Sequence, residues 1–126
     1  MNDITKKPIH SQEEVKELVD SFYDKVNQDP LLSPVFNDFA GVNWEEHLPI
    51  MYSFWSSILL GDYTYKGNPF LKHIPLPINK SHFDRWLELF METVDERFTG
   101  EKAEEAKQRA HSIAGIFQYR LSTLNR

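Results

Sequence analysis

The sequence predicts an all-α protein built from four main helices. Apolar residues recur at spacings of three and four along four stretches, which is the period of one face of a helix. No window alternates convincingly between apolar and polar residues, as a half-buried strand would. Glycine or proline residues lie at the breaks between these stretches, where helices commonly end. These observations favour a helical bundle with one long, irregular connection.

Composition bounds the class of protein. The chain has 126 residues, 40% of them hydrophobic and 13% aromatic, which fits one domain over residues 1–126 with a flexible leader over residues 1–10. The net charge of −5 and the lack of a basic tract argue against binding to nucleic acid or to an anionic membrane. The absence of cysteine excludes disulfides, thiolate zinc sites and thiol catalysis. Without an apolar run for a signal peptide or membrane span, we expect a soluble cytoplasmic protein.

The first helix is expected to begin at Ser11, because Glu14 three residues later completes the pattern of a capping box. The Asp29-Pro30 pair ends this helix, and a short irregular helical segment is expected around Phe36. The apolar stripe of the first helix comprises Val15, Leu18, Val19, Phe22, Tyr23 and Val26.

The second helix is expected to begin at Asn43, again with a glutamate, Glu46, three residues later. Pro49 near its start costs one early hydrogen bond or produces a small kink, and Gly61 ends it. Its stripe comprises His47, Ile50, Met51, Phe54, Trp55, Ile58 and Leu59.

The third helix is capped by Asn79 or Ser81, and the fourth begins after Gly100 and runs to about Leu121. The first half of the fourth helix is rich in alanine on its inner face, so a neighbouring helix can approach closely. The third stripe comprises Phe83, Trp86, Leu87, Phe90 and Val94, and the fourth comprises Ala103, Ala106, Ala110, Ile113, Ala114, Phe117 and Leu121.

His73 lies in a proline-rich stretch between the second and third helices. Pro75 and Pro77 stop any helix there, because each lacks an N–H and biases the preceding residue toward an extended backbone. A histidine on so short and rigid a segment is well placed to present one imidazole nitrogen to a metal. An ordinary surface or core histidine is the alternative interpretation.

Three further polar-tipped residues, Tyr23, His47 and Trp86, fall on apolar stripes of different helices. Each can be a core residue that hydrogen-bonds to the backbone, or can face a ligand. No carboxylate shares these stripes, so a di-iron bundle is not indicated, and no HExxH motif is present. One imidazole ligand in an aromatic, apolar pocket suits haem.

The chain resembles the truncated haemoglobins, most closely the group III type of bacteria, from about Ser11 to Leu121. The absence of the Gly-Gly motifs of groups I and II, together with His47 and Trp86, favours group III. The motifs that carry the resemblance are Phe22-Tyr23-Asp-Lys-Val, Asp29-Pro30-x-Leu32-x-Pro34-x-Phe36, Glu46-His47 followed by Phe54-Trp55, and Lys72-His73-Ile-Pro75-Leu-Pro77 followed by Phe83-x-x-Trp86-Leu87-x-x-Phe90.

The resemblance implies a 2-on-2 helical sandwich around a pocket for haem b. His73 matches the proximal histidine that binds haem iron, and Tyr23 and Trp86 match distal residues that donate hydrogen bonds to the bound ligand. His47 matches the distal residue that gates or polarises the pocket. The further haem contacts that the resemblance implies are Phe36, which wedges the porphyrin, Met51 and Phe54 on the distal side, and Lys72 as a propionate partner.

The implied function is reversible binding of dioxygen and of other diatomic ligands such as NO and CO. Two hydrogen bonds of roughly 1–3 kcal/mol each predict tight oxygen binding with slow release. One alternative is a haem redox enzyme, peroxidase-like or of the nitric oxide dioxygenase type, which needs an external reductase. A second is a helical interaction module without a cofactor. We expect a monomer or a weak dimer.

Overall fold

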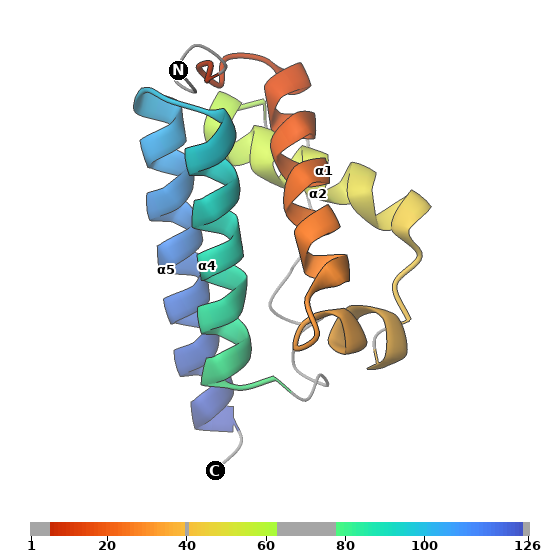
Figure 1. The fold of residues 1–126 in the computed structure, drawn as a ribbon. Helices are drawn as coiled ribbons and strands as arrows, with labels where there is room; N and C mark the ends of the chain where they lie inside the picture. The colour runs from red at the N-terminus through yellow and green to blue at the C-terminus, as the bar shows by residue number, and fades with distance from the viewer. Residues whose placement is uncertain (1–5, 40, 63–77, 125–126) are drawn as a thin grey trace.

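The four predicted main helices are present (Figure 1). The structure is a computed structural model, and it describes residues 6–39, 41–62 and 78–124. Within these ranges the backbone forms no β-strand, although Lys7 and Phe98 pair as an isolated bridge. The elements are α1 (Gln12–Gln28), the π-helical turn η2 (Val35–Phe39), α2 (Trp44–Leu60), α4 (Lys80–Arg97) and α5 (Glu101–Leu124).

The two long C-terminal helices, α4 and α5, lie side by side and antiparallel, and α1 packs against both α2 and α4 (Figure 1). Ala103, Ala106 and Ala110 are buried on the inner face of α5, so α4 approaches over small side chains as the sequence predicted. The predicted all-α sandwich of two helices on two is therefore confirmed. None of the described helices combines the length and the apolar character needed to cross a membrane.

Aromatic rings fill the centre of the core where α1, α2 and α4 meet. Phe90 has no exposed surface, and its ring stacks on Trp55 with a centroid distance of 4.8 Å and on Trp86 at 5.7 Å. Phe22 meets Phe90 edge-on at 5.2 Å. Large buried rings in offset and edge-on contact contribute both apolar burial and a further attraction between their quadrupoles. This block fixes how the three helices are oriented relative to one another.

The helix ends are fixed by local polar contacts. The Glu14 carboxylate accepts hydrogen bonds from Ser11 N at 2.9 Å and from Ser11 Oγ at 2.7 Å at the start of α1. Asn79, rather than Ser81, caps α4, because the Asn79 Oδ1 atom accepts from Ser81 N at 2.9 Å. At the C-terminal end of α2, Gly61 takes the left-handed conformation with φ of 71°, which glycine adopts without strain.

The second half of the expected flexible leader is packed rather than loose. Ile9 is 1% exposed and belongs to the core. The Lys7 backbone bonds on both sides, with Lys7 N donating to Arg97 O at 3.2 Å and Thr99 N donating to Lys7 O at 3.0 Å. The buried apolar side chain and the paired backbone hold residues 7–10 against the turn between α4 and α5. Residues 1–5 lie outside the described residues.

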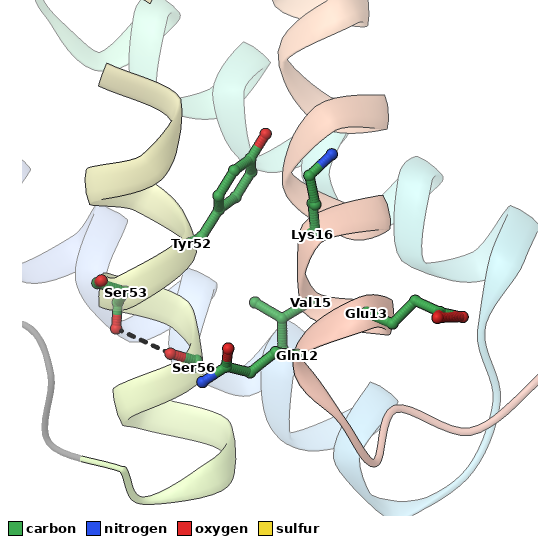
Figure 2. Close-up of a pocket in the computed structure, with 7 residues that line it drawn as sticks. All are labelled: Gln12, Glu13, Val15, Lys16, Tyr52, Ser53 and Ser56. Atoms are coloured by element: carbon green, nitrogen blue, oxygen red, sulfur yellow. Dashed lines mark hydrogen bonds between the residues drawn. The ribbon is translucent and has the colours of Figure 1, made fainter. Parts of the chain in front are cut away.

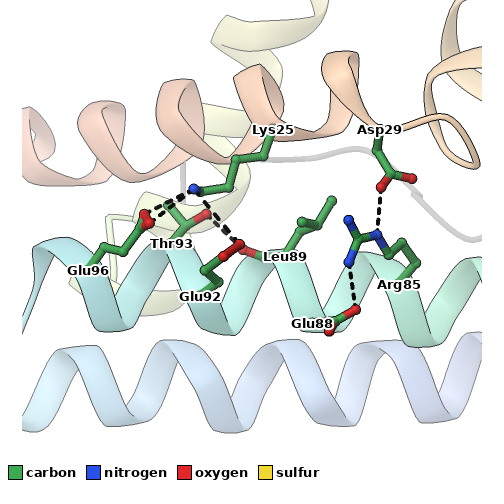
Figure 3. A network of polar contacts seen from close by, with 8 residues as sticks. All are labelled: Lys25, Asp29, Arg85, Glu88, Leu89, Glu92, Thr93 and Glu96. Carbon is green, nitrogen blue, oxygen red and sulfur yellow. Dashed lines mark hydrogen bonds and ion pairs between the residues drawn. The ribbon is translucent and has the colours of Figure 1, made fainter.

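Polar side chains bridge α1 and α4 along their outer edge (Figure 3). Lys25 Nζ lies 3.0 Å from Glu96 Oε2 and 3.9 Å from Glu92 Oε2. At the end of α1, Arg85 donates from Nε to Asp29 Oδ1 and from Nη1 to Glu88 Oε1. The Asp29 side chain is only 2% exposed, so this pair differs from the solvated ion pairs further along the helices.

Candidate functional site

Three of the predicted site residues come together where α1, η2 and the start of α2 meet. Tyr23 on α1 lies with its ring centroid 5.8 Å from that of Phe36 on η2 and 5.6 Å from that of His47 on α2. Phe36 and His47 are 6.5 Å apart by the same measure. Tyr23 is buried and the other two are half-buried. The sequence therefore predicted this cluster from residues that are far apart in the chain.

A fourth ring, that of Trp44, completes this cluster, and sequence reasoning missed it. The Trp44 ring lies 5.3 Å from Tyr23 and 5.4 Å from His47, and it stacks on Phe36 at 5.8 Å with an interplanar angle of 30°. Trp44 precedes His47 by three residues, and residues at that spacing share a helix face. That spacing was the available signal. We call Tyr23, Phe36, Trp44 and His47 the ring cluster.

Local backbone contacts position the two α2 members of the ring cluster. Asn43 caps α2, because its Oδ1 atom accepts from Glu45 N at 3.1 Å and its backbone oxygen accepts from His47 N at 2.8 Å. A backbone hydrogen bond from Val42 N to Phe36 O, at 2.9 Å, ties the residue before Asn43 back to η2. The first turn of α2 is thereby held against η2, with Trp44 and His47 facing the ring of Phe36.

Trp86 lies near enough to the hydroxyl of Tyr23 for its indole to act on that hydroxyl as a hydrogen-bond donor. Burial is the main cause that raises the pKa of Tyr23 well above its usual value, and the bond from Trp86 offsets part of this effect. Tyr23 therefore keeps its proton at any ordinary pH. The Trp86 ring is itself held edge-on by Phe22 at 5.5 Å. Tyr23 and Trp86 thus form one linked donor pair rather than two independent donors.

His47 places an imidazole nitrogen inside the protein. Its Nε2 atom is closed off from solvent, and its ring meets Tyr23 edge-on, at an interplanar angle of 82°. The other predicted wall residues of α2, Met51 and Phe54, lie one and two turns further on, half-buried against the core. Lys72 and His73, the predicted propionate partner and iron ligand, lie outside the described residues.

The buried carboxylate of Asp29 links the segment that leads to Phe36 with the part of α4 that carries Trp86. Asp29 Oδ2 accepts from the backbone N atoms of Leu31 and Leu32 at 3.1 and 3.0 Å, while Asp29 Oδ1 accepts from Arg85. Burial alone would raise the pKa of Asp29, but the bonds from Arg85 and from the two backbone groups outweigh it and hold the pKa below its usual range. No periodic pattern in the sequence predicts this contact.

A surface pocket of about 480 Å³ opens between α1 and α2 (Figure 2). Tyr52 on its α2 side donates a hydrogen bond to the Asp20 carboxylate, and burial together with Asp20 raises the pKa of Tyr52 to about 12. None of the predicted site residues within the described ranges lines this pocket. Its lining residues are Gln12, Glu13, Val15, Lys16, Tyr52, Ser53 and Ser56.

Most of the chain matches the model of one protein family. A family model described as bacterial-like globin matches residues 7–118. The chain belongs to the bacterial-like globin family. This globin is 38% identical over 112 residues to the group 3 truncated haemoglobin of Campylobacter jejuni, which covers 86% of this chain and 88% of the relative. It is 32% identical over 89 residues to a group 2 truncated haemoglobin of Bacillus subtilis, covering 67% and 64%.

The fold agrees with the same assignment. The crystal structure of the group III truncated haemoglobin from Campylobacter jejuni superposes with a TM-score of 0.84 and 37% identity, covering 92% of this chain and 94% of that one. The predicted relationship to truncated haemoglobins of the group III type is confirmed. The chain is thus a globin, a haem protein of a family that binds small gaseous ligands such as dioxygen.

The described residues fit a haem ligand pocket on their own chemistry. The Tyr23 hydroxyl and the buried Nε2 atom of His47 are polar groups set among the aromatic rings of Phe36 and Trp44. An apolar macrocycle needs such aromatic walls, and a small polar ligand needs few, well-placed polar groups. The ring cluster and Trp86 provide both kinds of group on the side formed by α1, η2, α2 and α4.

Proposed function

We propose that this globin binds haem b and uses the ring cluster to hold dioxygen and other diatomic ligands, with slow release of dioxygen. The observation that supports this most strongly is the ring cluster itself, in which buried Tyr23 and the solvent-inaccessible Nε2 atom of His47 lie against the rings of Phe36 and Trp44. Haem, when bound, supplies an iron with one open position for a small ligand.

Each residue has a distinct role in this proposal. His73 holds the iron, Lys72 binds a propionate, and Phe36, Met51 and Phe54 pack against the porphyrin. Tyr23 is the direct donor to the ligand, because its oxygen already accepts from Trp86 and its own proton remains to be donated. Trp86 orients and polarises that hydroxyl. His47, edge-on to Tyr23, adds a polar group on the other side of the same ring.

The physical reason for slow release is the charge on the ligand. A bound diatomic ligand that carries partial negative charge would be stabilised by a protonated donor such as Tyr23 in a dry pocket. The high pKa of buried Tyr23 keeps its proton on the hydroxyl. A bond of about 1–3 kcal/mol slows dissociation roughly 5- to 150-fold.

Absorbance spectra test the cofactor. Protein loaded with haem should give a Soret band in the ferric, ferrous and carbon monoxide forms, and a pyridine haemochrome spectrum should identify haem b. His73→Gly should remove the five-coordinate ferrous spectrum. Added imidazole should restore it by replacing the missing side chain. Protein that gives no Soret band after haem addition contradicts the proposal at its base.

Dissociation kinetics test the donor. Tyr23→Phe should speed dioxygen release roughly 5- to 150-fold, because the direct hydrogen bond is lost. Trp86→Leu should have a smaller effect, and the double variant should resemble Tyr23→Phe, because the two residues act in series. Tyr52→Phe is the matched control, since that hydroxyl bonds Asp20 outside the ring cluster. An unchanged release rate in Tyr23→Phe would rule out the donor role.

A further inference from the structure

Trp44 has two different environments on its two sides. Its ring contacts all three other members of the ring cluster, with centroid distances of 5.3 to 5.8 Å. Its indole nitrogen donates to Asn37 Oδ1 at 2.9 Å, an exposed contact between η2 and α2. Trp44 is half-buried. Trp44 therefore contacts the ring cluster with its ring and an exposed side chain with its indole N–H.

Asn37 is fixed in turn by contacts on its other side. Its Nδ2 atom donates to Asn27 Oδ1 at 3.0 Å and to Ser33 O at 3.0 Å. The amide thus has both its donor and its acceptor in use, and it joins the end of α1, the turn before η2 and the first residue of α2. A planar amide held in this way offers its carbonyl oxygen to Trp44 in one orientation.

We propose that Trp44 is a further residue of the ligand pocket, and that its hydrogen bond to Asn37 holds the wall that a diatomic ligand must pass to enter or leave. This inference rests on the proposed function. The wall is movable because Trp44 is half-buried, and the hydrogen bond that holds its indole lies at the exposed rim. The ring of Trp44 closes the cluster beside His47 and Tyr23, so its displacement opens the pocket without moving the donor pair.

The kinetic signature of such a wall differs from that of a donor. A wall that opens more often speeds entry and exit by the same factor and leaves the equilibrium constant unchanged. A lost donor changes the exit rate alone. A net hydrogen bond between neutral groups corresponds to roughly a three- to tenfold change in an equilibrium, so the open population of Trp44 should rise by about that factor when the bond is removed.

The experiment uses haem-loaded protein and carbon monoxide as the probe. Asn37→Ala should raise the association rate after flash photolysis and the dissociation rate in displacement by nitric oxide, each about three- to tenfold. Trp44→Phe keeps a ring and loses the N–H, so it should behave in the same way. The double variant should add nothing, because both changes remove one bond. Gln108→Ala, an exposed amide on α5, is the control and should change neither rate.

A second readout is independent of ligand kinetics. In the diamagnetic carbon monoxide form, the Trp44 indole N–H should exchange with solvent faster in Asn37→Ala, while those of Trp55 and Trp86 should not change. Faster exchange with both ligand rates unchanged overturns the proposal, because Trp44 then moves without controlling passage. A change in dissociation alone also overturns it. Either result leaves the proposed function standing if Tyr23→Phe still speeds dioxygen release.

Discussion

The aromatic core and the ring cluster use the same kinds of side chain in opposite ways. In the core, Phe90 is fully buried between Trp55 and Trp86, with apolar contacts on every side. In the ring cluster, Trp44 and His47 are half-buried, and a polar atom of Trp44 is bonded at the rim. The core rings therefore contribute mainly to stability, while the ring cluster combines aromatic packing with polar groups, of which the His47 Nε2 atom lies inside and the Trp44 N–H lies at the rim.

The largest loss of stability is expected at the centre of the core. Phe90→Ala removes a ring that has no exposed surface, and it should lower the free energy of unfolding by about 3–5 kcal/mol because a cavity remains. Urea denaturation followed by circular dichroism measures this. Phe90→Leu, which refills part of the space, should lose clearly less. Equal losses in the two variants would show that packing around Phe90 is not what matters.

A smaller loss is expected at the buried carboxylate. Asp29→Ala should lower the free energy of unfolding by roughly 1.5–3 kcal/mol, because hydrogen bonds to a charged acceptor are lost. Arg85 and two backbone N–H groups then lose their common partner. The same urea experiment measures this, and an unchanged midpoint would show that water replaces the carboxylate at no cost.

The pH dependence of stability follows from the same residue. The pKa of Asp29 in the folded protein lies below its ordinary value of 3.8, so folding favours the carboxylate. Its contribution is fully present above the unfolded pKa and is lost as the pH falls through the folded pKa. The stability advantage of the native protein over Asp29→Asn should therefore shrink below about pH 4. A difference that stays constant from pH 7 to pH 2 would contradict this.

A loss of about 1 kcal/mol is expected at the start of α1. Ser11→Ala removes the hydroxyl that contacts the Glu14 carboxylate and the side chain that belongs to the capping box. Thermal unfolding should show a lower Tm, with helix content unchanged at room temperature. Lys16→Ala, on an exposed part of the same helix, should shift the Tm much less.

The smallest effect on stability is expected at Asn37, where the expected effect on ligand passage is large. Asn37 is exposed, so water can replace much of its hydrogen bonding and Asn37→Ala should lower the free energy of unfolding by less than about 1 kcal/mol. This combination separates the two regions most clearly, because a core substitution lowers stability and a rim substitution changes kinetics. A loss of stability above 2 kcal/mol would make Asn37 a structural residue and remove the contrast.

The parts of this protein that could be predicted from its sequence are those with a local or periodic signal. The capping box at Ser11, the end of α1 at Pro30 and the buried stripe of α1 all follow from neighbours within a few residues. The convergence of Tyr23, Phe36 and His47 followed from a family resemblance that preserves spacing across the chain. His73, on which the prediction of iron binding depends, lies outside the described residues and remains a prediction.

The contacts that could not be predicted are polar and join distant residues. Asp29 and Arg85 are 56 residues apart, and neither stands out in a sequence in which 26% of residues are charged. Asn37 likewise has an unremarkable place in an irregular segment. Trp44 could have been found from its spacing to His47, but its bond to Asn37 depends on how η2 turns, and that conformation has no sequence signature of its own.

The docked segment around Lys7 and Ile9 has a practical consequence for where this protein can be cut. A chain trimmed to Ser11 keeps every helix, yet it loses the Ile9 side chain and both backbone bonds of Lys7. The turn at Phe98 and Thr99 would then face water where it now faces the backbone of Lys7. A protease that removes Lys7 and Ile9 should loosen the far end of α4, because that end loses its backbone partner and a core side chain. The functional boundary of the domain thus lies several residues before its first helix.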